Sequence, residues 1–427
     1  MRILIKEGRI LNPDKNEDFV GNILVDDGVI VKKTKDKIDG PADEIIEAEG
    51  CFVMPGLIDL HVHFRDPGFE YKETLKTGAD AAAKGGFTSV CTMPNTKPVM
   101  DSPEKVKLYD ERAKKEAVIN VLPVGAVTIG QNGEELTDIR GMKESGICAI
   151  SEDGKSVMNA GLYREAMRIA AECNIPVMAH CEDKNMVAGG VMNESQISKK
   201  LGFKGISNAV EDVIVARDII IAKETNATLH LCHCSTKDSV KMTKIAKEDG
   251  VKVTAEVCPH HFTLCDEDII ADDANYKMNP PLRAREDVEA LKAGLRENIM
   301  DVISTDHAPH SREEKQKSIS ESPFGIVGLE TSVSLTMTEL VDKGIITPLM
   351  MAEKMSYNPA KVLGIDKGTL NEGKIADITI INPDEDYVID SSTFVSKGKN
   401  TPFDGYKVKG KVKYTICNGN IVYKDKE

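Results

Sequence analysis

The sequence predicts an α/β protein: a (β/α)8 TIM barrel with a small discontinuous β-sandwich domain formed by the N- and C-terminal segments. Two observations predict this architecture. The middle of the chain alternates short apolar runs with helical segments, which is typical of βα units around a parallel sheet. Both ends instead carry alternating apolar and polar residues with turn signals, which is typical of antiparallel strands. We place the composite β domain at residues 1–54 plus 366–427 and the barrel at residues 55–365.

The two ends of the chain carry similar strand signals. Near the N-terminus, RILIKEGRI and GNILVDDGVIVKK alternate and contain turn residues such as Gly28. Near the C-terminus, KIADITIINP is followed by KVKYTIC and NIVYKD around an Asn418-Gly419 turn, which predicts a hairpin. A few strands alone are marginally stable. We therefore expect the two pieces to pair into one domain.

Eight apolar, β-rich runs lie between these ends. Segments with apolar residues at helical spacing, such as AGLYREAMRIAAECN, separate them. Eight such units in about 250 residues match a barrel, and barrel enzymes place their chemistry at the C-terminal ends of the strands. The polar residues that end the runs should therefore meet at one mouth. The runs cover residues 56–63, 88–95, 120–127, 146–153, 175–183, 228–235, 251–259 and 300–309.

The composition excludes several classes of protein. Of 427 residues, 41% are apolar and 29% are charged, in no long blocks, so the chain is globular rather than disordered. Lys plus Arg is 55 against 69 for Asp plus Glu, a net charge of −14 that would repel nucleic acid. No apolar run reaches the roughly 18 residues of a membrane span, and the start lacks the apolar core of a signal peptide. We expect a soluble, cytoplasmic protein without nucleic-acid or membrane partners.

The cysteines favour a structural role. Ten are scattered along the chain, mostly within apolar runs, which predicts reduced thiols rather than a disulfide framework. Cys232 and Cys234 flank His233 and could suggest a thiolate metal site. Since no matching CxxC pair accompanies them, we favour the structural interpretation.

The histidines point to metal chemistry. His61 and His63 close the first run, and because strand residues alternate faces, Asp59 shares their side of the sheet. Taken alone, this pair is weak evidence, since two ordinary polar residues at a strand end explain it equally well. Four further imidazole or carboxyl groups lie at the ends of other runs: Asp153, His180, His233 and Asp306. Jointly, four imidazoles and two carboxylates form an N/O shell suited to two divalent ions, with zinc the first choice.

Motifs in the order GLIDLHVHFRDPG, CTMPNT, ISEDG, MAHCED, CHCS, MNPPLR, STDHAPH and PFGIVGLE carry a family resemblance. Together they resemble the dihydroorotases of the amidohydrolase superfamily, over nearly the whole chain. The resemblance implies reversible cyclisation of N-carbamoyl-L-aspartate to L-dihydroorotate in de novo pyrimidine biosynthesis. It also implies Zn²⁺ as cofactor, with two ions or a single ion per chain left open.

The resemblance assigns the metal ligands. It implies one metal held by His61, His63 and Asp306, a second held by His180 and His233, and a bridging Asp153. Many relatives place a carboxylated lysine at this bridge on the fourth strand. Here Lys155 is the competitor, but it lies past the strand in a glycine-containing turn, so we favour Asp153. Glu152 replaces an aspartate that is frequent in the family, and we expect it to point away from the metals.

The implied reaction explains these residue types. Metal ions lower the pKa of a bridging water towards neutrality, so that hydroxide is available as nucleophile, and they polarise the attacked carbonyl. Asp306 would act as general base and then as general acid towards the departing ring nitrogen.

The substrate carries a carboxylate, which calls for cationic and amide donors. Arg65 follows the histidine pair and could form a bidentate pair with that carboxylate, although a surface arginine is the plain alternative. Glycine permits close approach of the backbone to a ring. The resemblance implies further substrate contacts by Asn95, Asn279, His310, Phe324 and Gly325.

The remaining histidines receive other interpretations. His230 has the opposite strand parity to His233, so we expect it to face the outer helices. His260 and His261 follow a proline at a strand end, and we expect them near the mouth but outside the metal shell. His307 is expected to be structural.

Two rival functions stay open at this point. A hydantoinase or allantoinase would share the barrel, but Asp153 and Arg65 favour a dihydroorotase. A non-catalytic, dihydroorotase-like scaffold would be expected to lack metal ligands, whereas all six are present. The resemblance also leaves open a complex with aspartate carbamoyltransferase and a homo-oligomer.

Overall fold

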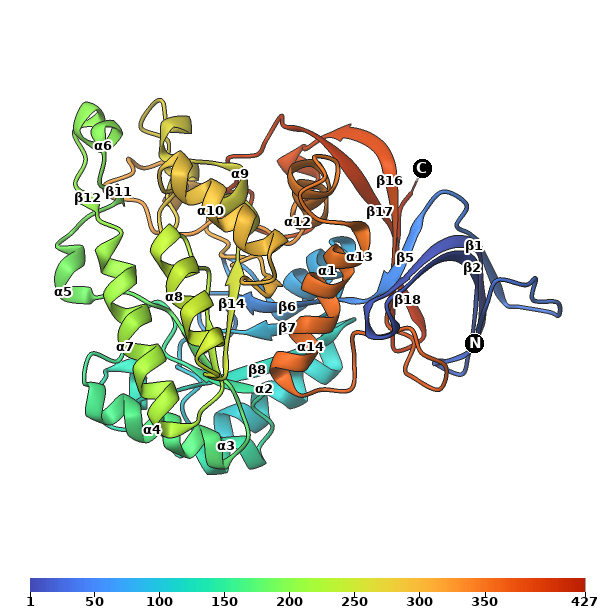
Figure 1. Ribbon diagram of the computed structural model, residues 1–427, viewed down its shortest axis with the longest axis horizontal. Coiled ribbons are helices and arrows are strands. Elements are labelled where there is room, and N and C mark those ends of the chain that lie inside the picture. Colours follow the sequence, from blue (N-terminus) through green and yellow to red (C-terminus); the bar gives the residue numbers. More distant parts are fainter. Residues whose placement is uncertain (427) are drawn as a thin grey trace.

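A closed parallel barrel forms the centre of the protein in the computed structural model, which describes residues 1–426 (Figure 1). Neighbouring strands pair in chain order, and the barrel closes where His63 N–H donates to the His307 carbonyl oxygen at 2.8 Å. Every predicted run overlaps one strand, which confirms the barrel. The strands are β6 (Leu57–Val62), β7 (Phe87–Thr92), β8 (Asn120–Ala126), β9 (Ala149–Ser151), β10 (Val177–Ala179), β13 (Leu229–Leu231), β14 (Val253–Val257) and β15 (Val302–Ile303).

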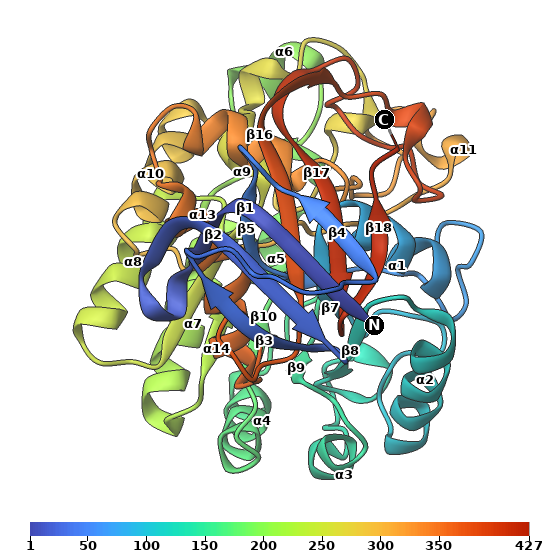
Figure 2. The same cartoon turned by 90° about the vertical axis from the view of Figure 1, so that its right-hand side faces the viewer.

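Amphipathic helices surround the strands (Figure 2). Polar side chains cap them: the Thr74 hydroxyl accepts from Thr77 N–H at the start of α1, and the Asn159 side chain accepts from Leu162 N–H at the start of α4. The principal helices are α1 (Leu75–Lys84), α2 (Pro103–Glu116), α3 (Ile139–Glu144), α4 (Ala160–Glu172), α7 (Ala209–Thr225), α8 (Lys237–Glu248), α10 (Arg285–Arg296), α12 (Ser332–Thr336), α13 (Pro348–Ala352) and α14 (Asn358–Leu363).

The N-terminal end of the barrel is plugged by the segment that leads into α14. Apolar residues of that helix join the cluster inside the barrel, together with Ile58 and Val302. The Ser356 hydroxyl donates to the Pro55 carbonyl oxygen, and the Asn358 side chain donates to the Asp301 carbonyl oxygen, both just before a strand starts. Chemistry is thereby confined to the opposite end of the barrel.

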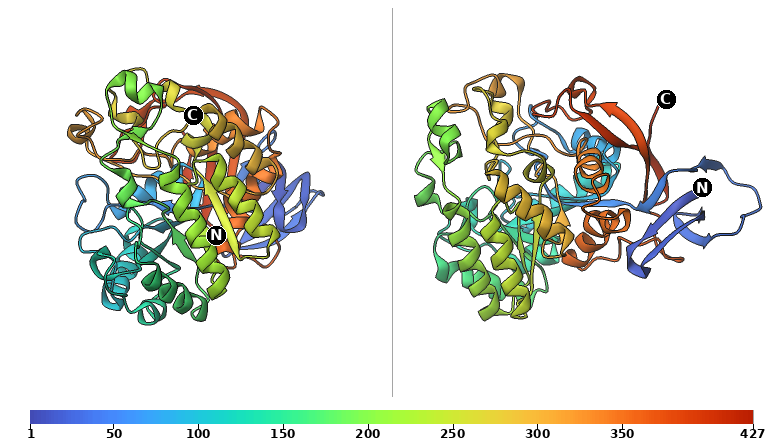
Figure 3. Two further views of the ribbon diagram at one scale, coloured as in Figure 1. Left: turned by 60° about the vertical axis from the view of Figure 1, so that its left-hand side comes forward. Right: turned by 45° about the horizontal axis from the view of Figure 1, so that its top comes forward.

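Both ends of the chain build a second, eight-stranded sheet beside the barrel (Figures 1 and 3). β5 pairs antiparallel with β16, which joins the N-terminal strands to the C-terminal ones as predicted. The predicted turn at Asn418-Gly419 connects β17 to β18, with positive φ at both residues, as a tight hairpin requires. The strands are β1 (Arg2–Asn12), β2 (Glu17–Asp26), β3 (Val29–Thr34), β4 (Glu44–Glu47), β5 (Phe52–Pro55), β16 (Ile378–Val388), β17 (Lys407–Cys417) and β18 (Asn420–Lys424).

The terminal sheet curls around one apolar core. The hairpin between β2 and β3 bonds back to the segment that precedes β16, where Ile30 N–H donates to the Lys374 carbonyl oxygen at 2.9 Å. Isoleucines from both ends of the chain fill the space, among them Ile5, Ile23 and Ile378. The residue boundaries 1–54, 55–365 and 366–427 stay a prediction.

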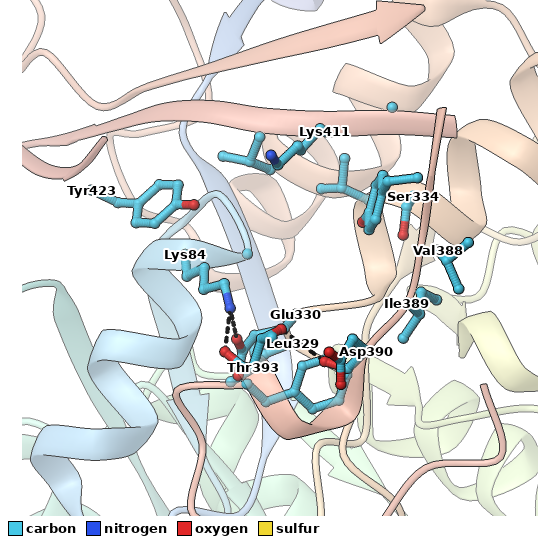
Figure 4. A pocket seen from close by; sticks show the side chains of 16 residues that line it. Lys84, Leu329, Glu330, Ser334, Val388, Ile389, Asp390, Thr393, Lys411 and Tyr423 are labelled. Carbon is cyan, nitrogen blue, oxygen red and sulfur yellow. Dashed lines mark hydrogen bonds and ion pairs between the residues drawn. The ribbon is translucent and has the colours of Figure 1, made fainter. Parts of the chain in front are cut away.

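Residues 389–406, here called the C-terminal excursion, leave the terminal sheet between β16 and β17 and run along the barrel. Figure 4 shows its beginning, where Lys84 of α1 points at Glu330 and Thr393. The Lys84 ammonium lies 2.8 Å from the Glu330 carboxylate, which also accepts from the backbone N–H groups of Val395 and Ser396. The excursion is therefore fastened to the barrel by charge-assisted hydrogen bonds.

A buried arginine fastens a second excursion. Short strands β11 (Met192–Asn193) and β12 (Gly205–Ile206) flank α6 (Gln196–Leu201) above the barrel. The Arg283 guanidinium donates to the Ile206 carbonyl oxygen at 2.8 Å and to the Ser235 hydroxyl at 3.1 Å, and lies 3.8 Å from the Glu211 carboxylate. Both side chains of the ion pair are almost fully buried.

No helix of the described chain is long and apolar enough to cross a membrane.

Arg283→Met should lower the free energy of unfolding by about 3–5 kcal/mol, because it leaves the Glu211 carboxylate buried without its counter-ion. Denaturant unfolding measures the loss. Arg285→Met is the matched control, since its pair with Asp268 is half-exposed and worth about 0–1 kcal/mol. Equal losses in the two variants would contradict this account of Arg283.

Candidate functional site

The six predicted metal ligands meet at the C-terminal mouth of the barrel. Each lies at or just beyond the end of a strand, and all six side chains are buried. Their positions follow from the (β/α)8 topology, which aligns the ends of all eight strands. These residues are His61 in β6, His63 directly after it, Asp153 after β9, His180 after β10, His233 after β13 and Asp306 after β15.

Asp153 lies at the centre of the group. Its carboxylate oxygens are 3.2 Å from His61 Nε2 and 3.4 Å from His63 Nε2. They are also 3.6 Å from His180 Nδ1 and 3.7 Å from His233 Nε2. One carboxylate thus contacts four imidazoles from three strands, which is the position a bridging ligand requires.

The four histidines around Asp153 form two pairs, His61 with His63 and His180 with His233. His180 Nδ1 and His233 Nε2 face each other at 3.0 Å. Asp306 joins the other pair, with its Oδ1 3.2 Å from His63 Nε2 and 3.7 Å from His61 Nε2. The ligand atoms of His61, His63 and Asp306 all lie within 4.8 Å of one another.

The imidazoles keep both carboxyl groups ionised. Burial alone would raise the pKa of Asp153, but His61 and His233 outweigh it and hold that pKa well below its usual range. The same balance, with His63 and His61 as the stabilising neighbours, lowers the pKa of Asp306. Both groups are therefore carboxylates at neutral pH.

A hydrogen bond on the far side of the His63 ring sets its tautomer. His63 Nδ1 lies 2.9 Å from Asn95 Oδ1, so Nδ1 carries a proton, and Nε2 lies 3.2 Å from Asp306 Oδ1. Asn95 Nδ2 also donates to Asp153 at 3.2 Å. Asn95, predicted as a substrate contact, thus orients two of the predicted metal ligands.

Glu256 accepts a hydrogen bond from His61 and so fixes its tautomer, as Asn95 does for His63. Glu256 was not identified from the sequence. Its carboxylate lies 3.2 Å from His61 Nδ1 and accepts from the His233 backbone N–H at 3.1 Å. The other oxygen lies 3.0 Å from His230 Nε2. Burial opposes ionisation of Glu256, but the hydrogen bonds from His230 and His61 hold its pKa well below the usual range. A single glutamate within the apolar run that forms β14 was the signal available in the sequence.

His230 corrects an expectation. It was predicted to face the outer helices, but it bonds to Glu256 and Thr254 on the neighbouring strand, while Leu229 and Leu231 pack into the apolar core around the barrel. Strand alternation stops at Leu231, because β13 ends there and His233 adopts a left-handed backbone with φ of 34°. Counting the alternation of side chains back from His233 therefore assigned His230 to the wrong face of the strand.

The competing residues lie outside the group. The Lys155 ammonium donates to the Gln131 carbonyl oxygen at 3.0 Å and does not line the cavity at the mouth. Glu152 points away, as expected, and accepts from Val127 and Thr128 N–H groups. His307 is structural, also as expected, since its Nδ1 accepts from Gly328 N–H.

His260 and His261 are buried, do not line the cavity and lie outside the predicted metal shell. His261 Nε2 donates to the Pro280 carbonyl oxygen at 2.9 Å, next to Asn279. Burial lowers the pKa of His261 to about 3, so the ring is neutral.

Three site residues adopt left-handed backbone conformations that side chains other than glycine rarely take. They are Arg65 with φ of 60°, His233 with φ of 34° and Asp306 with φ of 49°. Such conformations cost about 1–3 kcal/mol each and persist only where the surroundings enforce them. Their concentration at one mouth marks it as the functional end of the barrel.

A cavity of about 160 Å³ opens beside the metal ligands. Ten of the twelve predicted site residues line it, and Gly154 and Ala308 complete the wall; the ten are His63, Arg65, Asn95, Asp153, His180, His233, Asn279, Asp306, Phe324 and Gly325. His61 lies behind Asp153. His310 contacts both Arg65, at 3.3 Å, and the Phe324 carbonyl oxygen, at 2.8 Å.

The wall opposite the metal ligands is cationic. The Arg65 guanidinium donates to the Pro309 carbonyl oxygen at 3.2 Å and has no carboxylate partner within residues 1–426. Lys72 lies 3.1 Å from His310 Nδ1, so the ring proton sits on Nε2. Burial and the cations Arg65 and Lys72 lower the pKa of His310, which keeps the imidazole neutral.

Comparison with known proteins identifies the family. A model described as dihydro-orotase-like matches residues 50–239. A dihydroorotase from Pelotomaculum thermopropionicum is 49% identical over 426 residues, covering 100% of this chain and 99% of that protein. A dihydroorotase from Bacillus cytotoxicus is 47% identical and covers 99% of this chain and 98% of its own. This chain belongs to the dihydroorotase family. The resemblance predicted from the motifs is confirmed.

Solved structures of cyclic amide hydrolases share the fold of this dihydroorotase-family chain. The L-hydantoinase from Arthrobacter aurescens superposes with a TM-score of 0.89 at 28% identity, covering 100% of this chain and 96% of that one. The dihydropyrimidinase from Brevibacillus agri superposes with a TM-score of 0.87, and at 24% identity it supports the fold alone. The chain is an enzyme of the cyclic amidohydrolase class.

The dihydroorotase family implies a divalent metal, and the residues present fit one. Imidazole nitrogens and carboxylate oxygens converge from all sides, with no lysine or arginine between them. His61 Nε2, which faces Asp153, is buried and lacks a hydrogen-bond partner within the described residues. Imidazole nitrogens together with ionised carboxylates form a donor set suited to a divalent cation.

Proposed function

We propose that the protein is a dihydroorotase that interconverts L-dihydroorotate and N-carbamoyl-L-aspartate in de novo pyrimidine biosynthesis. The observation that carries the proposal is the cavity itself, which joins a metal-ligand wall to a wall with an uncompensated guanidinium. The first wall suits hydrolysis of an amide. The second suits a substrate with a carboxylate, which hydantoin and allantoin lack.

Two zinc ions are the proposed cofactor. His61, His63 and Asp306 would hold one ion, His180 and His233 the other, and Asp153 would bridge them. The position of Asp153 within 3.7 Å of all four imidazoles supports the bridge. When bound, the ions would lower the pKa of a water molecule and polarise the amide carbonyl.

Asp306 is the proposed general base and acid. Its side chain reaches the cavity from the strand-end turn after β15, and the imidazoles keep it ionised, which is the form a base requires. In the hydrolytic direction Asp306 would accept the proton of the attacking water and transfer it to the departing ring nitrogen. In the reverse direction it would take a proton from the carbamoyl nitrogen as the ring closes.

Arg65 would bind the substrate carboxylate, with Asn279 and the Phe324–Gly325 backbone beside the ring. Gly325 has φ of 128°, and a Cβ there would lie 2.6 Å from the Ala308 side chain, so glycine is required at this close approach. A complex with aspartate carbamoyltransferase, a homo-oligomer and a cytoplasmic location stay predictions.

Turnover of three cyclic amides tests the proposal. The zinc-loaded enzyme should hydrolyse dihydroorotate with kcat/KM about a hundredfold or more above that for hydantoin or allantoin, because those rings leave Arg65 unpaired. Exhaustive chelation should abolish the activity and zinc should restore it. Activity confined to an uncharged ring would reject the assignment in favour of a hydantoinase or allantoinase, and a metal-loaded but inert protein would indicate a scaffold.

Two carboxylate variants separate the assigned roles. Asp306→Asn should retain most of the metal but lose about 10²–10⁴-fold in kcat, because the amide cannot accept a proton. Asp153→Ala should lose metal stoichiometry, because it removes the bridge. Elemental analysis and kcat give both readouts, with exposed Glu165→Gln on α4 as the control. Near-normal turnover in both site variants would contradict the roles.

Glu256→Gln tests the support of His61. The amide keeps the shape but loses the charge that fixes the His61 tautomer, so zinc affinity should fall by about 10–100-fold. Competition with a coloured chelator measures it, and the thermal midpoint separates metal loss from unfolding. Unchanged affinity would show that His61 needs no carboxylate behind it.

A further inference from the structure

Asn400, in the C-terminal excursion, lies between the two loops that form the proposed substrate wall. The first loop, residues 306–310, follows β15, and the second, residues 324–327, precedes α12. Asn400 comes from outside the barrel and from the opposite end of the sequence to Arg65. Its side chain is only 4% exposed.

The Asn400 amide uses its oxygen and both hydrogens on these loops. Its Oδ1 accepts from His310 N–H at 3.0 Å. Its Nδ2 donates to the Ala308 carbonyl oxygen at 3.2 Å and to the Gly325 carbonyl oxygen at 3.0 Å. The backbone carbonyl oxygen of Asn400 accepts from Val327 N–H at 2.9 Å. One residue therefore joins both loops.

Only a side chain that donates and accepts at the same point can make this link. An aspartate would turn its oxygen towards two carbonyl oxygens. A leucine of similar size would leave the Ala308 carbonyl oxygen and the His310 N–H buried without partners, and the Gly325 carbonyl oxygen would keep only its bond from the Lys315 ammonium. The loops held in this way carry His310, which contacts Arg65 at 3.3 Å, and Gly325, which faces the cavity. None of the four loop residues bonded by Asn400 is a proposed metal ligand.

We propose that Asn400 is a positioning residue for substrate recognition, which sets the distance between the His310 loop and the Gly325 loop without touching the metal ligands. The proposal rests on the proposed function, since the wall it positions is the one assigned to the substrate. It predicts a defect in substrate binding that is separate from metal binding and from the chemical step.

The test uses the full-length, zinc-loaded enzyme and the variants Asn400→Leu and Asn400→Asp. KM for dihydroorotate should rise by about tenfold to a hundredfold, with kcat and zinc content within about threefold of wild type, because two or three hydrogen bonds at the substrate wall are lost. Thr401→Val is the matched control. Within residues 1–426, its neighbouring, equally buried hydroxyl accepts only from Phe403 N–H, inside the excursion itself.

Hydrogen exchange gives a readout that needs no turnover. Amides in residues 306–328 should exchange faster in Asn400→Leu than in wild type, while those of β8 should not change. Wild-type KM in both variants, or an equal rise in Thr401→Val, would overturn the role of Asn400. If Asn400→Leu does not fold, the KM of Asn400→Asp for dihydroorotate decides whether Asn400 has this role. If wild type does not open dihydroorotate, the proposed function fails, and equal exchange in variant and wild type would then reject Asn400 separately.

Discussion

The buried carboxylate of Asp153 is the constraint on which the rest of the site depends. A carboxylate removed from water is costly unless cations or hydrogen-bond donors surround it. Asp153 is 3% exposed and has four imidazole nitrogens within 3.7 Å. These imidazoles come from three strands, so the compensation exists only when the barrel is closed. The bond between His63 N–H and the His307 carbonyl oxygen, which closes it, also brings Asp306 to its place.

The groups behind the ligands decide what the ligands can do. An imidazole presents a lone pair inward only if its other nitrogen holds the proton, and Glu256 and Asn95 accept hydrogen bonds from the Nδ1–H groups of His61 and His63. Glu256 can remain ionised in the apolar barrel because His230 and His61 both bond to it. The strained backbone at His233 fits the same scheme, since Glu256 accepts from its N–H. The site is a network in which each buried charge requires its neighbours.

The sequence predicted the barrel and the metal wall because both depend on short-range patterns. Eight apolar runs and their polar ends are visible without any knowledge of contacts, and the topology then collects His61, Asp153 and Asp306. The prediction from the sequence failed at His230, because the alternation of side chains cannot be counted through His233, whose backbone is left-handed. It missed Glu256, because one glutamate in an apolar run carries no sign of its partners. Asn400 could not be predicted from the sequence, because its side-chain contacts join segments 75 to 92 residues apart, and no local pattern marks them.

The substrate wall shows why a chain of net charge −14 can hold an anion. Long-range repulsion is screened within about 10 Å at ordinary ionic strength, so the local groups decide. Three cations surround His310, and two are already engaged. Lys72 pairs with Glu314 at 2.9 Å, and the Lys315 ammonium donates to three backbone carbonyl oxygens. Arg65 alone of the three lacks a carboxylate or a full set of acceptors within the described chain, so a substrate carboxylate would supply the partner that the fold leaves out.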